Sequence, residues 1–357
     1  MFFNDWYERL LFLITTFSVL IQAYVILLVV KVSPSSMKTY RYFLISYTIW
    51  DLLFTIVLGF VLDIDVKLPL MAGGYINGLA KYCGPHGGIL ALSFFTFLAG
   101  GLMYSMINGL VFRYAAVQTD PTFMQWLMKP MTYVWSFLMA ILIAFIAGFS
   151  VYLALSKPET YDHDLPLPEF QAVIKDIANG QVIVNLNPFE WPTIRMAIVL
   201  IFGFMAAQVA AFLLGFATLR NLNRNARFFS QKTFRMHLQF TVVLCIQIAT
   251  PVVFIVFPMT VGGINVLIVK SMDKLPAQIG LLLMSLYASS NSLLSIFFIS
   301  PYRRYSMNLI LKIVPCYIGT KENYLSSAQG TPKVLRSVSQ CYVSKNRVNS
   351  VYSHVLI

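Results

Sequence analysis

The residue types that most often bind metals or carry out catalysis are few and scattered in this sequence. Histidines and cysteines number four each: His86, His163, His237, His354, Cys83, Cys245, Cys316 and Cys341. Their spacing fits neither a zinc site nor a dense framework of disulfides. No HExxH, GxSxG, P-loop or glycine-rich dinucleotide motif occurs. The sequence therefore predicts no enzyme, no metal site and no cofactor.

Asp51 is the one carboxylate inside any of the long apolar stretches. An ionisable group near the middle of a bilayer costs about 3 kcal/mol on insertion scales, so this side chain should face other helices. Two interpretations remain open. Asp51 is either a polar switch or ion site that responds to a change of conformation, or a hydrogen-bonded packing group that holds its helix against its neighbours.

The composition shows what kind of element must position such a residue. The chain has 357 residues, of which 58% are hydrophobic and 11% charged, whereas soluble domains carry roughly 25% charged residues. Helices need about 20 apolar residues to cross a bilayer, and their backbone groups are then satisfied internally. Seven stretches qualify: Leu10–Val30, Tyr42–Leu62, His86–Phe112, Pro130–Leu155, Met196–Leu219, Leu238–Met259 and Ala277–Ser300. We expect an all-α membrane protein, a seven-transmembrane helix bundle.

The basic residues predict the orientation of this bundle. Segments 31–41, 113–129, 220–237 and 301–357 hold 18 of the 26 Lys and Arg residues, with only Asp120 and Glu322 as acids. Basic residues in short loops stay in the cytoplasm, so the N-terminus is expected outside and the C-terminus inside. The net charge of +12 then marks a cytoplasmic face that attracts membrane lipid. It does not indicate nucleic-acid binding.

This gives four segments along the chain. Residues 1–9 are an extracellular N-terminus, 10–300 the transmembrane domain, 301–313 a short amphipathic eighth helix, and 314–357 a cytoplasmic tail of disordered composition. Ser300 and Pro301 suit the start of the eighth helix, and basic and apolar residues then alternate as in an interfacial helix. Cys316, just beyond, is a candidate for palmitoylation, with a plain free thiol as the alternative.

Four passages resemble a known family. They are SPSSMKTYRYFLISYTIWDLLF (33–54), GLVFRY (109–114), KTFRMHLQFTVVLCIQIATP (232–251) and SPYRRY (300–305). In order and spacing they resemble the nematode serpentine chemoreceptors of the Str superfamily, most closely classes H and I, over residues 10–313. The resemblance implies a G-protein-coupled chemosensory receptor that detects an odorant or secreted metabolite. It also implies signal transduction through a heterotrimeric G protein, a role in olfaction, and a place in the plasma membrane of a sensory neuron cilium.

Several residues then become candidates for a switch. Arg113 and Tyr114 end the third span, where the resemblance implies contact with the G protein; snorkelling to the lipid interface is the alternative for Arg113. Pro251 could give the sixth span a pivot, although kinks are common in membrane helices. Asn291 lies in a seventh span that lacks the NPxxY signature of rhodopsin-like receptors.

Further candidates follow from depth and charge. A cue site in spans with no charge besides Asp51 should take a neutral or amphiphilic small molecule, and depth in the membrane points to Phe94, Met284 and Tyr287. The candidates that face the G protein are Arg220, Arg224, Arg227 and Arg303, although attraction to anionic lipid explains the short basic loop equally well. Serines of the tail are candidate phosphorylation sites, with a receptor kinase and arrestin as partners.

A seven-span transporter or ligand-gated channel for a small molecule is the alternative function. No repeat relates the first three spans to the last three, and no matched pair of spans is interrupted by glycine or proline. An insect-type odorant channel would have the opposite topology. One structural question stays open, because Cys83 has no cysteine partner in the second outer loop, 156–195, to order that loop.

Overall fold

The computed structural model is a helix bundle, and all seven predicted spans are helices in it. It describes residues 6–33, 40–66, 73–118, 120–156, 171–186, 190–228, 230–258, 260–261 and 274–311. Seven helices in these ranges are long and apolar enough to cross a membrane. They belong to α1 (Trp6–Val32), α2 (Tyr40–Ile56), α3 (Gly84–Val117), α5 (Pro130–Ala154), α8 (Trp191–Arg224), α9 (Gln231–Pro251) and α11 (Lys274–Phe298).

Two of these helices change their winding near one end. A π-helix, η2 (Val57–Leu62), continues α2, and a second, η7 (Val252–Val256), continues α9. Such wide turns are rare and concentrate at functional sites. The second one follows Pro251, whose ring removes a backbone donor from the helix. A pivot at Pro251 remains a prediction, and the change of winding at this residue is consistent with it.

Short elements connect the spans. They are η3 (Leu79–Cys83), α4 (Pro121–Leu127), α7 (Gln171–Ala178) and η6 (Ala226–Phe228). Asp120 caps α4 by accepting hydrogen bonds from the Thr122 hydroxyl and from the Thr122 backbone N–H (2.9 Å). These two bonds, the hydroxyl's first, hold the pKa of the Asp120 carboxyl below its usual value. The strands β1 (Ile64–Asp65), β2 (Gly73–Ile76) and β3 (Val182–Asn185) form an antiparallel sheet in that order.

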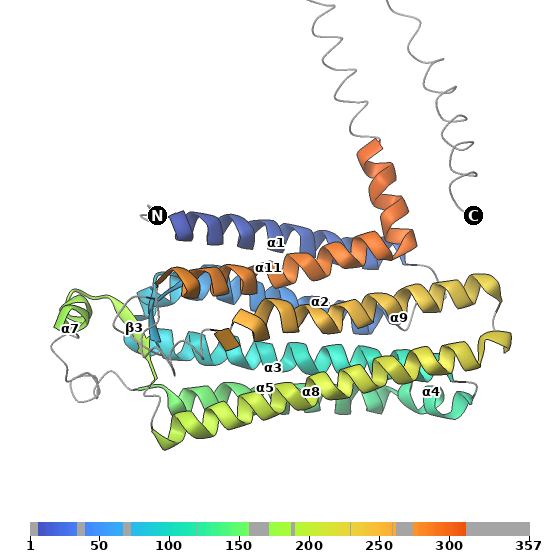
Figure 1. Cartoon of the computed structure of the whole chain (residues 1–357), viewed down its shortest axis with the longest axis horizontal. Coiled ribbons are helices and arrows are strands. Elements are labelled where there is room, and N and C mark those ends of the chain that lie inside the picture. The colour runs from blue at the N-terminus through green and yellow to red at the C-terminus, as the bar shows by residue number, and fades with distance from the viewer. Residues whose placement is uncertain are drawn as a thin grey trace, which may run out of the picture. The chain divides into compact units, whose positions relative to one another are not determined.

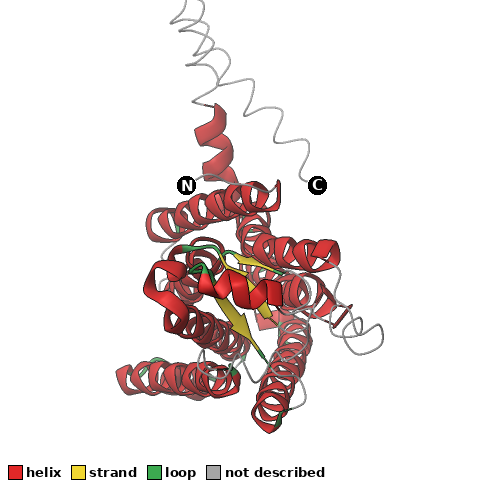
Figure 2. Cartoon of the chain, turned by 90° about the vertical axis from the view of Figure 1, so that its left-hand side faces the viewer, coloured by secondary structure: helices red, strands yellow, loops and turns green. Residues whose placement is uncertain are grey.

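The bundle therefore has two distinct ends (Figure 1). We call the end with the three strands and α7 the sheet end, and the opposite end the α4 end. Seen along the bundle, the strands and α7 lie across the helix ends (Figure 2). The chain enters α1 at the sheet end and leaves α11 at the α4 end.

The core lies along α3, which packs against α2, α5 and α8. Aromatic side chains of α5 and α8 point the other way: Phe137, Phe202 and Phe212 are 60%, 71% and 69% exposed. A water-soluble fold would bury such rings, whereas a bilayer favours them on the surface. The exposed apolar belt is therefore the lipid-facing surface of the bundle.

The chain divides into two units, Met1–Arg303 and Arg304–Ile357. Residues 300–311 are helical, over most of the range predicted for the eighth helix. The predicted disordered tail (314–357), its serines and Cys316 lie outside the described residues. Tyr302, in the first unit, is fully buried and its hydroxyl lies 2.7 Å from Ser33 Oγ.

Candidate functional site

A set of buried polar side chains joins three helices in the middle of the bundle. The amide of Asn291 on α11 donates to the Tyr47 hydroxyl on α2 (2.9 Å), and its oxygen accepts from Thr250 Oγ1 on α9 (2.8 Å). The hydroxyls of Tyr47 and Tyr287 lie 3.3 Å apart. We call these four residues the Asn291 cluster. Since buried polar groups are costly when unpaired, the cluster fixes how α2, α9 and α11 meet.

A second contact between α9 and α11 lies one turn earlier in α9, at Gln247. The Gln247 amide donates to Ser295 Oγ (3.0 Å), which in turn donates to the Asn291 carbonyl oxygen (3.1 Å). Together with Thr250, these bonds occupy the last turn of α9 before Pro251 and the π-helix. The sequence indicated Asn291 and Pro251 as separate candidates. In the structure Asn291 is bonded to Thr250, the residue directly before Pro251.

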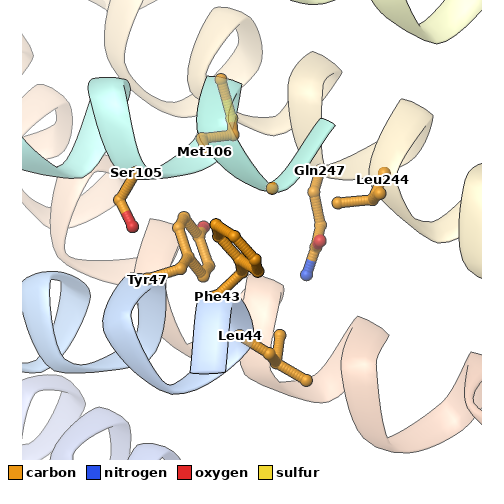
Figure 3. Close-up of a pocket in the computed structure, with 8 residues that line it drawn as sticks. Phe43, Leu44, Tyr47, Ser105, Met106, Leu244 and Gln247 are labelled. Atoms are coloured by element: carbon orange, nitrogen blue, oxygen red, sulfur yellow. The ribbon is translucent and has the colours of Figure 1, made fainter. Parts of the chain in front are cut away.

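A small cavity of about 20 Å³ lies beside this cluster (Figure 3). It is lined by Phe43, Leu44, Tyr47, Ser105, Met106, Gly109, Leu244 and Gln247. A Cβ atom added to Gly109 would meet nothing within 4 Å, so this glycine leaves space rather than filling it. A cavity of this volume with several polar neighbours is large enough for one water molecule.

Asp51 faces the interior, as expected from the cost of a carboxylate in lipid. It is 1% exposed, and the Gln22 side chain of α1 lies close to its carboxyl. Gln22 donates to Thr55 Oγ1 (3.3 Å), and Thr55 donates to the Asp51 carbonyl oxygen (2.8 Å). These contacts join α1 to α2, which agrees with a packing role. Asp51 also lies near Tyr287 of the Asn291 cluster, so the interpretation of Asp51 as a switch stays open beside the packing role.

Arg113 is buried near the α4 end. Only 3% of this residue is exposed, and it lies close enough to His237 of α9 for its charge to act on that imidazole. The alternative that Arg113 snorkels to the lipid interface is therefore not supported. Tyr114 is half-buried, while four other arginines predicted to face the G protein are exposed: Arg220, Arg224, Arg227 and Arg303.

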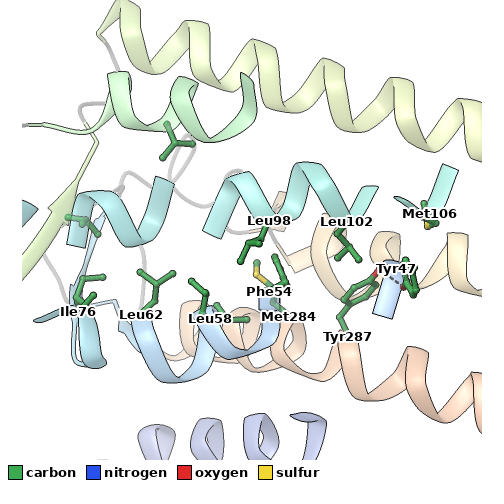
Figure 4. Packing of buried hydrophobic residues seen from close by; sticks show 14 of the residues in the cluster. Tyr47, Phe54, Leu58, Leu62, Ile76, Leu98, Leu102, Met106, Met284 and Tyr287 are labelled. Carbon is green, nitrogen blue, oxygen red and sulfur yellow. Dashed lines mark hydrogen bonds between the residues drawn. The ribbon is translucent and has the colours of Figure 1, made fainter. Parts of the chain in front are cut away.

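The three residues predicted to line a cue site do not come together. Met284 and Tyr287 are buried in the core with Leu98, 6% and 0% exposed (Figure 4). Phe94 is 48% exposed and stacks on Phe97, with ring centroids 5.8 Å apart. Phe94 differs from Met284 and Tyr287 because it lies on another face of its helix. Depth in the membrane specifies how far along a helix a residue lies, whereas helical periodicity specifies which face it occupies.

The sheet orders part of the connection between α5 and α8. β2 and β3 pair over four residues, and Tyr75 donates to Asp176 of α7 (2.9 Å). Burial first, and then this bond, raise the pKa of Tyr75. β3 packs closely on α3, since a Cβ at Gly88 would lie 2.9 Å from Val182. Strand pairing thus fixes this connection against the bundle, which is the role that a disulfide to Cys83 would have had. Cys83 is an exposed free thiol.

Three acidic residues that no sequence motif marks gather at the sheet end: Glu8, Asp63 and Asp65. Asp63 is buried and has a left-handed backbone with φ of 42°. Burial, and then the charges of Glu8 and Asp65, raise its pKa to about 7, while Lys81 opposes this. Gln278 donates to Asp65 (3.0 Å) and so ties α11 to β1. Within the described ranges, no three His, Cys, Asp or Glu side chains are placed to hold a metal.

Comparison with solved structures defines the class of protein. The fold matches the crystal structure of squid rhodopsin with a TM-score of 0.54 over 87% of this chain and 86% of that one, at 12% sequence identity. At that identity the likeness shows the fold alone, which is the seven-helix fold of G-protein-coupled receptors. None of the curated protein sequences compared with the chain matches it.

The family follows from a match to the whole bundle. Residues 3–312 match the family model described as serpentine type 7TM GPCR chemoreceptor Srh. The chain belongs to this family, and it is a G-protein-coupled chemoreceptor and a multi-pass membrane protein. Membership in this family implies a small-molecule ligand and coupling to a G protein. The family is a class of receptors and not a class of enzymes. The alternative of a transporter or channel is not favoured.

Proposed function

We propose that a small, neutral cue changes the hydrogen bonds of the Asn291 cluster, and that α9 then moves at the α4 end to admit a G protein. The observation that carries this proposal is the position of the cluster. It joins α2, α9 and α11 through buried bonds at the turn where α9 becomes a π-helix. A few buried hydrogen bonds that can exchange partners provide the two discrete arrangements that a switch requires.

Arg113 is the residue that such a movement would uncover. It is buried in this structure, with His237 of α9 nearby. If α9 moves outward, the guanidinium becomes accessible beside the exposed Arg220, Arg224 and Arg227. Together they would present a basic surface to an acidic face of the G-protein α subunit.

The orientation of the receptor belongs to the same proposal. The sheet end is extracellular and the α4 end cytoplasmic, in the plasma membrane of a sensory neuron cilium. The sorting of basic residues toward the loops of the α4 end supports this orientation. A receptor kinase acting on the tail serines, arrestin, and palmitoylation of Cys316 complete the proposal on the cytoplasmic side.

The test is a G-protein activation assay in cells that express the intact chain, screened against small volatile and secreted metabolites. We expect at least one cue to activate the wild type. Asn291→Leu should reduce that response about tenfold or more, because it removes one buried hydrogen bond from each of the Thr250 and Tyr47 hydroxyls. Arg113→Ala should abolish G-protein activation.

Asn179→Leu is the matched control, since Asn179 is an exposed residue of the turn after α7. It should respond like the wild type at equal surface expression. A cue-evoked ion current that persists when G proteins are blocked would instead favour the channel alternative. An Asn291→Leu response equal to that of the control would contradict the switch while leaving the receptor assignment intact.

A further inference from the structure

A larger cavity lies at the lipid-facing surface of the bundle, between α2, α3 and α5. Its volume is about 160 Å³. It is lined by Tyr42, Phe43, Ser46, Trp50, Tyr104, Ser105, Asn108, Tyr133, Ser136, Phe137 and Ala140. Tyr42 and Phe137 at its rim are 58% and 60% exposed, and Ser46 is exposed as well. Since this face belongs to the apolar belt, the cavity is open to the bilayer. We call it the membrane crevice.

The polar groups in the membrane crevice are neutral. Asn108 donates to Ser136, which leaves the Asn108 oxygen as an acceptor, and Ser105 makes only a long contact of 3.5 Å with Ser46. None of the lining residues is charged. Hydrogen-bonding groups that face hydrocarbon gain from a partner that water would otherwise supply. The wall therefore favours a molecule with one neutral polar group and disfavours an ion.

The remaining wall is aromatic, with Trp50, Tyr133 and Phe137 around the opening. Flat apolar rings of this kind bind another ring by stacking or edge contacts. An apolar cavity of about 150 Å³ is known to accept benzene. The volume of the membrane crevice thus matches a single six-membered ring.

We propose that the membrane crevice is a binding site for a neutral compound with one ring and one hydroxyl group, which enters from the bilayer. The ring lies against Trp50 and Phe137, and the hydroxyl group reaches Asn108. This site is separate from Met284 and Tyr287. It shares Phe43 and Ser105 with the small cavity that Tyr47 of the Asn291 cluster also lines. A compound bound in the membrane crevice would therefore contact two residues that also line the cavity beside this cluster.

The experiment measures binding directly and does not depend on signalling. The full chain is placed in phosphatidylcholine nanodiscs, and saturable binding of labelled benzyl alcohol is measured by equilibrium dialysis against empty nanodiscs. Toluene, which lacks the hydroxyl group, should bind about tenfold more weakly because the hydrogen bond is lost. Benzoate, which is charged, should not compete.

Two variants test the location. Ser46→Phe places a ring in the membrane crevice from an exposed position and should remove saturable binding. Asn108→Leu should lower the affinity for benzyl alcohol to about that for toluene, because the hydroxyl group loses its hydrogen-bond partner. Phe149→Leu is the control, because Phe149 is a lipid-facing residue of α5 outside the crevice and 46% exposed. Thermal unfolding confirms that each variant is folded.

Three results would overturn the proposal. The first is that the wild type shows no binding above empty nanodiscs. The second is that Ser46→Phe binds like Phe149→Leu, and the third is that toluene and benzyl alcohol bind equally. The receptor proposal would survive each of them, since it depends on G-protein activation and not on this site.

Discussion

At the scale of the residue, burial changes what a charged side chain can do. Arg113 and Asp63 stand near opposite ends of the bundle, and both are largely removed from solvent. A buried charge is stable only where neighbouring groups stabilise it. Asp63 has the carboxylates Glu8 and Asp65 nearby, and only Lys81 favours its ionised form. Since its pKa is raised to about 7, the protonation of Asp63 should respond to physiological pH.

The first prediction concerns Asp63. Its pKa rises from 3.8 to about 7 on folding, so the folded state holds this proton more tightly than the unfolded state. Stability should therefore fall as pH rises from about 4 to about 7, by at most about 4 kcal/mol, since one pKa unit corresponds to about 1.4 kcal/mol. Asp63→Asn should lose this dependence and be the more stable protein above pH 7.

Thermal unfolding of both proteins in nanodiscs at pH 5 and pH 8 checks this prediction. The difference between wild type and variant isolates Asp63 from other groups that titrate in the same range. Parallel shifts of the two melting temperatures with pH would show that this carboxyl is ionised throughout.

At the scale of the element, close approach between helices depends on single small residues. One case that involves backbone is α3 against α5, where a Cβ at Gly148 would lie 2.7 Å from the Ser93 carbonyl oxygen and 2.9 Å from Phe97 Cβ. Small residues at such crossings let membrane helices pack closely without a hydrophobic driving force. Since α3 also packs against α2 and α8, a shift at this crossing would reach most of the bundle.

The second prediction is a pair of glycine substitutions. Gly148→Ala should destabilise the bundle by about 2 kcal/mol, because the clash involves backbone that cannot rotate away. Gly203→Ala on α8, where an added Cβ meets nothing within 4 Å, should be neutral or up to about 1 kcal/mol stabilising. Melting temperatures in the same detergent compare the two. Equal effects would mean that α3 and α5 are not this close.

At the scale of the whole molecule, the two ends differ in structure and in charge. The sheet end is closed over by strands and α7, whereas short basic connections lie at the α4 end. Strand pairing holds the sheet end together without a disulfide, and Cys83 is a free thiol. This asymmetry is what allows the receptor to present different surfaces to a cue and to a G protein.

The third prediction tests the orientation on which the signalling proposal rests. An epitope tag at the N-terminus should be accessible to antibody on intact cells, and a tag at the C-terminus only after permeabilisation, because basic loops remain in the cytoplasm. Tags accessible on the same side would require an even number of crossings. Accessibility of the C-terminal tag alone would reverse the proposed direction of signalling.

The sequence by itself determined the seven helices, their approximate limits, and the burial of Asp51. Hydrophobic length and the cost of a charge in lipid act locally, so both can be deduced from neighbouring residues. Tertiary structure alone decided that Asn291, Thr250 and Tyr47 form one cluster, that Phe94 faces outward, and that strands pair across two loops. These outcomes depend on which face each helix presents to its neighbours and on contacts between distant segments. Local sequence patterns leave the rotation and pairing of segments open.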